Sequence, residues 1–115
     1  MVDANVRVRD FLENGFHLVA GDGGLENPIE GVYICDLLSW VMAKSKPKNA
    51  WITIQSHVNI VAVALMVEQS CIIVSEGVEV EREAVERANE EAMPILSFPG
   101  TSYEAAIKLY QLLSK

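Results

Sequence analysis

Basic residues are few in this sequence of 115 residues. Nine Lys and Arg stand against 16 Asp and Glu, which gives a formal net charge of −7. A nucleic-acid-binding surface needs a surplus of Lys and Arg to neutralise phosphates, so the charge argues against a nucleic-acid partner. It argues equally against docking on an anionic membrane. The longest uninterrupted apolar run, Ile60 to Val67, is far shorter than the ~20 residues that span a bilayer.

Cysteine is also scarce. Cys35 and Cys71 belong to no CxxC pair, and residues 1–10 carry several charges without an apolar stretch. A secretory signal needs such a stretch, so we expect a cytoplasmic protein with reduced thiols and with Cys71 buried in its apolar run. No pair of Cys or His residues has a chelating spacing, and no phosphate-binding P-loop motif is present. The sequence therefore predicts neither a metal nor a cofactor.

Apolar residues, in contrast, make up half of the chain, which is too many for a disordered protein. The length fits a single domain, residues 1–115. Strand and helix patterns alternate along it. Strands are expected at 16–20, 31–35, 50–54, 71–75 and 94–98, and helices at 37–44, 57–69, 81–92 and 102–113, after a short amphipathic helix that ends at Asn14 and Gly15. This order predicts a three-layer α/β/α domain with a mostly parallel sheet of about five strands.

Polar residues and glycines mark the expected ends of these elements. Asp36 and Ser56 are predicted to cap the helices that follow them. Thr101 and Glu104 have the spacing of a capping box. Residues 21–24, with three glycines, are predicted to form a flexible surface turn, because glycine tolerates a positive φ angle.

Loops that lead from a strand into a helix are the places to look for a ligand site, because parallel sheets bind ligands beyond the carboxyl ends of their strands. The expected loops are 35–36, 55–59, 75–77 and 97–102. The second holds the densest polar cluster, which consists of Gln55, Ser56, His57 and Asn59. At a helix start, free N–H groups and the dipole favour an anion, so we predict a site for a small anionic or phosphate-bearing ligand here. The alternative is a capped helix in which His57 packs or faces solvent.

Three segments carry a family resemblance: DLLSWVM (36–42), WITIQSHVNIVAVA (51–64) and PILS (94–97). They resemble stand-alone DRTGG-domain proteins, which are similar to the N-terminal domain of HPr kinase/phosphorylase. The resemblance covers about residues 6–113. Two turns give the family its name. They correspond here to Gln55-Ser56-His57, with His57 in place of Arg, and to Ser75-Glu76-Gly77, which keeps only the last glycine.

The resemblance implies a regulatory, ligand-sensing or assembly domain that has no catalytic centre and forms a homodimer. For stand-alone relatives it also implies an iron–sulfur protein as partner. The ligand site would then comprise Gln55, Ser56, His57, Asn59, Ser75, Glu76, Gly77 and Asp36. Two alternatives stay open. One is a pure scaffold with a flat apolar face that includes Trp40. The other is a small enzyme in which His57 acts as general base near Asp36 or Glu76.

Overall fold

The computed structural model describes residues 5–114, so the first four residues of segment 1–10 and the last residue of domain 1–115 lie outside the description. Five strands form one sheet in the order β1-β5-β4-β3-β2. The bounds are β1 (His17–Ala20), β2 (Gly31–Ile34), β3 (Asn49–Thr53), β4 (Cys71–Val74) and β5 (Ile95–Ser97). Strands β2 to β5 run parallel, and β1 pairs antiparallel with β5.

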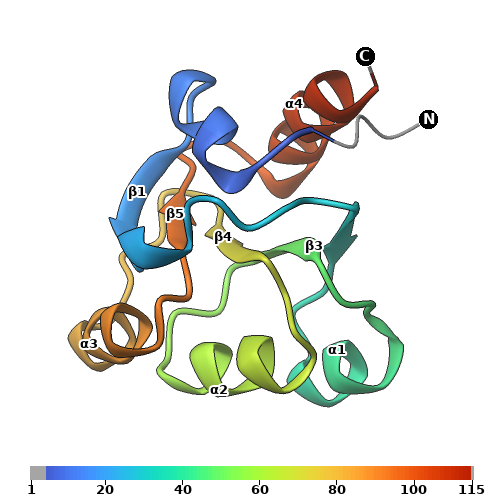
Figure 1. Ribbon diagram of the computed structural model, residues 1–115. Coiled ribbons are helices and arrows are strands. Elements are labelled where there is room, and N and C mark those ends of the chain that lie inside the picture. Colours follow the sequence, from blue (N-terminus) through green and yellow to red (C-terminus); the bar gives the residue numbers. More distant parts are fainter. Residues whose placement is uncertain (1–4, 115) are drawn as a thin grey trace.

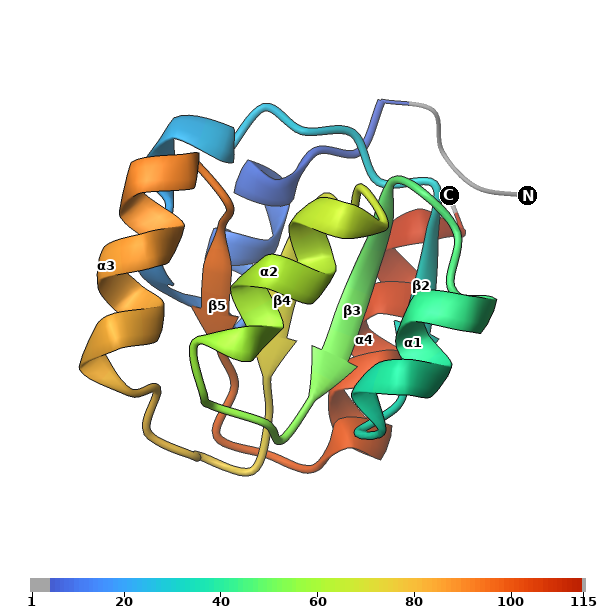
Figure 2. The same cartoon turned by 90° about the horizontal axis from the view of Figure 1, so that it is seen from below.

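Helices cover both faces of the sheet. One face carries α1 (Leu38–Lys44), α2 (Asn59–Met66) and α3 (Arg82–Glu91), and the other carries α4 (Ser102–Leu113) and the 3₁₀ helix η1 (Val8–Glu13) (Figure 1). Figure 2, seen from below, shows α1 to α3 in front of the sheet and α4 behind it. A second 3₁₀ helix, η2 (Asp22–Gly24), follows β1. The predicted three-layer α/β fold is confirmed.

The apolar residues divide between two cores, one on each face. Side chains of a strand point alternately to the two faces. In β3, Trp51 therefore packs toward α1, α2 and α3, whereas Ala50 and Ile52 pack toward α4 and η1. All four residues of β4 are buried, which explains the continuous apolar run that contains Cys71. Burial raises the pKa of the Cys71 thiol far above its usual range.

Two of the predicted helix caps are wrong. Helix α1 begins after Leu37 and α2 begins after Val58, and neither has a side-chain cap. Asp36 and Ser56 make other contacts, described below. The capping box of α4 is confirmed: Glu104 N–H donates to Thr101 Oγ1 at 3.1 Å, and Thr101 N–H donates to Glu104 Oε1 at 2.9 Å.

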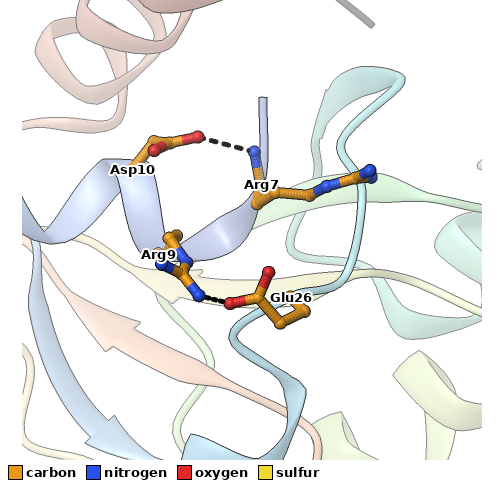
Figure 3. Close-up of polar contacts among 4 residues, drawn as sticks. All are labelled: Arg7, Arg9, Asp10 and Glu26. Carbon is orange, nitrogen blue, oxygen red and sulfur yellow. Dashed lines mark hydrogen bonds and ion pairs between the residues drawn. The ribbon is translucent and has the colours of Figure 1, made fainter. Parts of the chain in front are cut away.

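The short amphipathic helix expected in the N-terminal segment is the 3₁₀ helix η1, whose C-cap is Asn14. The Asp10 carboxylate accepts a hydrogen bond from Arg7 N–H at 2.8 Å, and Arg9 forms an ion pair with Glu26 (Figure 3). Backbone bonds add to this attachment, since Val8 N–H donates to the Asn27 carbonyl at 3.1 Å. The segment is thereby fastened to the chain that leads into β2, where its buried side chains cover the α4 face of the sheet.

Residues 21–24 do not form the flexible surface turn that the glycines predict. Gly21 and Gly24 are buried, and Gly21 N–H donates to Asn89 Oδ1 at 2.8 Å. A Cβ atom on Gly21 would lie 2.1 Å from the Met93 carbonyl oxygen. The glycines are therefore needed for close packing against the end of α3, in addition to the φ of +78° at Gly21.

Candidate functional site

The four parallel strands end at one edge of the sheet, which we call the carboxyl edge. The loops that follow them comprise residues 35–37, 54–58, 75–81 and 98–101. Seven of the eight predicted site residues fall in the first three of these loops, and Asn59 is the first residue of α2. The topology thus brings residues from different parts of the sequence to the same edge, as the strand order requires.

Asp36 ties the first two loops together. Its Oδ1 atom accepts hydrogen bonds from Thr53 Oγ1 and from Ile54 N–H, both at 2.8 Å. The Gln55 side chain donates from Nε2 to the Asp36 carbonyl oxygen at 3.0 Å. The Thr53 hydroxyl lies in a fully buried residue and needs such a partner. This explains why the Asp36 carboxylate accepts hydrogen bonds from Thr53 and Ile54 instead of capping α1.

The turn before α2 presents free backbone donors. The N–H groups of Ser56, His57 and Val58 have no hydrogen-bond partner within residues 5–114. His57 Nδ1 accepts the Asn59 N–H at 3.2 Å, which assigns its proton to Nε2. The Ser56 carbonyl accepts the Glu81 N–H at 3.2 Å and so joins this turn to the loop that leads into α3.

The turn Ser75-Glu76-Gly77, in the third of the predicted loops, is held by hydrogen bonds to residues 98–102 after β5. Ser75 is fully buried, and its Oγ lies 2.6 Å from Ser102 Oγ at the start of α4. Glu76 N–H donates to the Gly100 carbonyl at 2.7 Å, and Gly77 N–H donates to the Phe98 carbonyl at 3.0 Å. Glu76 and Gly77 both have positive φ angles, +63° and +66°. The glycine fits that conformation without strain, but the glutamate does not.

A cavity of about 440 Å³ lies beside this turn. It is lined by residues 77–80 of the loop into α3, by residues 97–99 at the end of β5, and by His17 and Val19 of β1. Of the predicted site residues only Gly77 contributes to it. The cavity as a whole was not predicted, because His17 and Val19 reach the other lining residues only when β1 pairs with β5 in the folded sheet. One part of the lining, residues 97–99, does fall in a loop that the sequence predicted between a strand and a helix, residues 97–102.

The general-base alternative lacks an orienting group. Within the described chain, no carboxylate oxygen lies within 4.0 Å of a His57 nitrogen, so neither Asp36 nor Glu76 pairs with it. Residues 5–114 also hold no group of three or more His, Cys, Asp or Glu side chains arranged for a metal ion. No helix in the same range is long and apolar enough to cross a membrane.

The fold and the carboxyl edge define a small α/β domain with two helical layers around a mostly parallel sheet. The family model of the DRTGG domain matches residues 14–112, and the chain belongs to this family. The comparison with curated proteins gave no match.

The fold is also similar to a solved structure from Clostridium perfringens. That structure contains the CBS and DRTGG domains of the regulatory region of a pyrophosphatase, complexed with the activator diadenosine tetraphosphate. The TM-score is 0.75 at 16% sequence identity, over 98% of this chain and 52% of that chain. The protein therefore spans about half the length of that regulatory region, and at this identity the similarity is one of fold.

Proposed function

We propose that the protein is a non-catalytic regulatory domain that senses a small anionic, phosphate-bearing ligand at the turn formed by residues 55–59. The observation that carries the proposal is the set of three adjacent unpartnered N–H groups on Ser56, His57 and Val58. Successive backbone N–H groups before a helix form a concave site with positive potential, which suits a phosphate or carboxylate. The solved regulatory region with a nucleotide activator supports the ligand class.

The side chains at the turn add to its preference for an anion. Because His57 Nδ1 accepts a hydrogen bond, the protonated Nε2 remains as a donor. Asn59 is exposed at the first position of α2, so its amide is accessible to a ligand. Asp36 and Gln55 hold the turn in place through Thr53 and Ile54. In this proposal Ser75, Glu76 and Gly77 form the neighbouring wall.

Thermal denaturation tests this proposal. We expect inorganic phosphate, AMP or a small carboxylic acid to raise the melting temperature of the wild type, because a ligand that binds only the folded state stabilises it. The His57→Ala/Asn59→Ala variant should lose most of this increase. Lys46→Ala removes an exposed cation outside the turn and serves as the matched control. An equal response in wild type and double variant would refute the site.

We also propose that the domain self-associates through the edge strand β2. An apolar groove of about 490 Å³ runs between β2 and α4 and is lined by Ile34 and Tyr110, which are 49% and 71% exposed. Strand β2 contains no charged residue or proline that would block pairing with another strand. The opposite edge, β1, has an irregular register between Leu18 and Ala20, which disfavours such pairing.

Sedimentation velocity tests the homodimer. We expect a dimer at micromolar concentration for the wild type and a monomer for Ile34→Lys, because a charge on the edge strand opposes pairing. Leu18→Lys, on the other sheet edge, is the control and should remain dimeric. A monomeric wild type would contradict self-association. A dimer that responds to no ligand would favour the scaffold alternative, for which the half-exposed Trp40 provides an apolar surface.

Three further parts of the proposal come from the resemblance and the composition. The domain is similar to the N-terminal domain of HPr kinase/phosphorylase, it acts in the cytoplasm, and an iron–sulfur protein is its partner. Co-purification of the tagged protein from its native cells, with iron analysis of the eluate, tests the last part. An eluate without iron would refute it.

A further inference from the structure

Among the four parallel strands, only one pair of neighbours, β4 and β5, is followed by loops that lead to opposite faces of the sheet. After β4 the chain passes into α3, which lies on the face that also carries α1 and α2. After β5 it passes into α4 on the other face (Figures 1 and 2). Loops that diverge in this way leave a crevice at the carboxyl ends of the two strands, where open α/β sheets bind their ligands. The cavity of about 440 Å³ occupies this crevice.

The walls of the crevice are mainly apolar and are fixed in place. Val78 and Val80 stand on the α3 side, and Phe98 and Pro99 on the α4 side. Phe98 stacks on Phe16 with ring centroids 4.8 Å apart. The hydrogen bond from Gly77 N–H to the Phe98 carbonyl holds the two loops together. The volume lies within the range of small-molecule sites, which are largely preformed and apolar with a few polar groups.

Two polar side chains in the crevice have no partner. Ser97 and His17 are paired residues of the antiparallel strands β5 and β1, so their side chains project on the same face of the sheet. Both line the cavity. Neither the Ser97 hydroxyl nor the His17 imidazole makes a hydrogen bond or an ion pair within residues 5–114. Together they provide neighbouring donor and acceptor atoms at one end of an apolar slot.

The charge of the crevice disfavours a phosphate in it. Glu79 contributes a carboxylate to the lining, and no Lys or Arg lines the cavity. A neutral ring with N–H donors and ring-nitrogen acceptors can form hydrogen bonds with Glu79, Ser97 and His17. An amino group of the ring can donate to the Glu79 carboxylate, and ring nitrogens can form hydrogen bonds with the other two side chains. Its flat faces would lie against the valines, Phe98 and Pro99.

We propose that this crevice binds a purine-type nucleobase. The inference rests on the proposed function, because it completes the ligand whose phosphate would lie at the turn before α2. The two places are adjacent along the carboxyl edge. Val80 lines the crevice, and the next residue, Glu81, donates its N–H to the Ser56 carbonyl. The protein would then recognise a purine nucleotide through the base at β4 and β5 and through the phosphate at the end of β3.

Isothermal titration with adenosine and, separately, with inorganic phosphate tests the two parts independently. Adenosine should bind the wild type, and about tenfold more weakly to His17→Ala/Ser97→Ala, because two hydrogen bonds of modest strength are lost. Ser97→Ala alone is the second variant if the double variant melts at a lower temperature. Leu18→Ala, on the same strand but outside the lining, is the control and should bind like the wild type.

The possible outcomes separate the two proposals. If phosphate or AMP binds but adenosine does not, the crevice proposal is overturned while the proposed function stands. Equal adenosine affinity in the wild type and in the His17 and Ser97 variants overturns it as well. Adenosine binding that depends on His17 and Ser97, without any phosphate binding, supports the crevice and refutes the phosphate site. Failure of both ligands to bind overturns both.

Discussion

Asp36 holds the first two loops of the carboxyl edge in place, and its replacement by alanine has a predictable cost. One carboxylate oxygen accepts two hydrogen bonds of 2.8 Å, from Thr53 Oγ1 and Ile54 N–H. Hydrogen bonds to a charged group contribute about 1.5–3 kcal/mol each in favourable cases. Asp36 is exposed, so water can replace it at Ile54. Thr53 is fully buried. Its hydroxyl would still accept the Gln55 N–H at 3.1 Å, but its O–H would lose its acceptor, at a cost of about 1–3 kcal/mol.

We therefore expect Asp36→Ala to lower the free energy of unfolding by about 2 kcal/mol. Asp36→Asn keeps an acceptor at the same position and should cost about half as much. Urea denaturation, followed by the fluorescence of the buried Trp51, measures both. The midpoint should fall without a change in the slope m, since the same surface becomes exposed on unfolding.

A double-mutant cycle identifies the contact responsible. Thr53→Val removes the buried hydroxyl, so Asp36→Ala should cost less in that background than in the wild type, with a coupling energy of about 1 kcal/mol. A loss below about 0.5 kcal/mol for Asp36→Ala, which is the range of ordinary surface substitutions, would show that the hydrogen bonds do not hold the loops. Strict additivity in the cycle would refute the role of Thr53.

Three further predictions follow from the backbone and the thiols. Glu76→Gly should raise the free energy of unfolding by about 0.5–1 kcal/mol in urea denaturation, because the φ of +63° strains a glutamate; Glu76→Ala should give no such gain. Gly21→Ala should cost about 3 kcal/mol, since its Cβ would overlap the Met93 carbonyl. Gly77→Ala should cost only about 1 kcal/mol, because a Cβ there would meet the Pro99 carbonyl oxygen at 3.9 Å, an ordinary contact distance. Equal losses would show that close packing at Gly21 does not matter. In the folded protein a thiol reagent should modify the half-buried Cys35 and leave Cys71 unmodified until urea is added, and rapid labelling of both would refute this.

Features that depend on near neighbours in the sequence could be predicted, and the capping box of α4 is an example. Thr101 and Glu104 are three residues apart, and each satisfies the backbone N–H of the other. The alternation of apolar runs and helix patterns likewise predicted the three-layer fold. Both depend on local hydrogen bonds and side-chain periodicity, which are present in the sequence itself.

Features that depend on contacts between distant segments were missed. Asp36 has the residue type of a cap, but Thr53 and Ile54 take its carboxylate from 17 and 18 positions away. The glycines at 21–24 have the composition of a loop, but Gly21 packs against Met93. The crevice needs His17 beside Ser97, and that pairing depends on the antiparallel placement of β1 next to β5. No pattern near His17 indicates which strand will be its neighbour.

We propose that the carboxyl edge of the sheet senses a ligand. The most direct test is a two-dimensional ¹H–¹⁵N NMR titration of the labelled protein with AMP. We expect shifts of the amide signals of Ser56, His57 and Val58 at the phosphate site, and of residues 77–80, 97, 98 and 100 around the crevice. Shifts confined to the loops that lead into β4 and β5, at residues 68–70 and 91–93, would contradict this proposal, as would the absence of shifts at millimolar AMP.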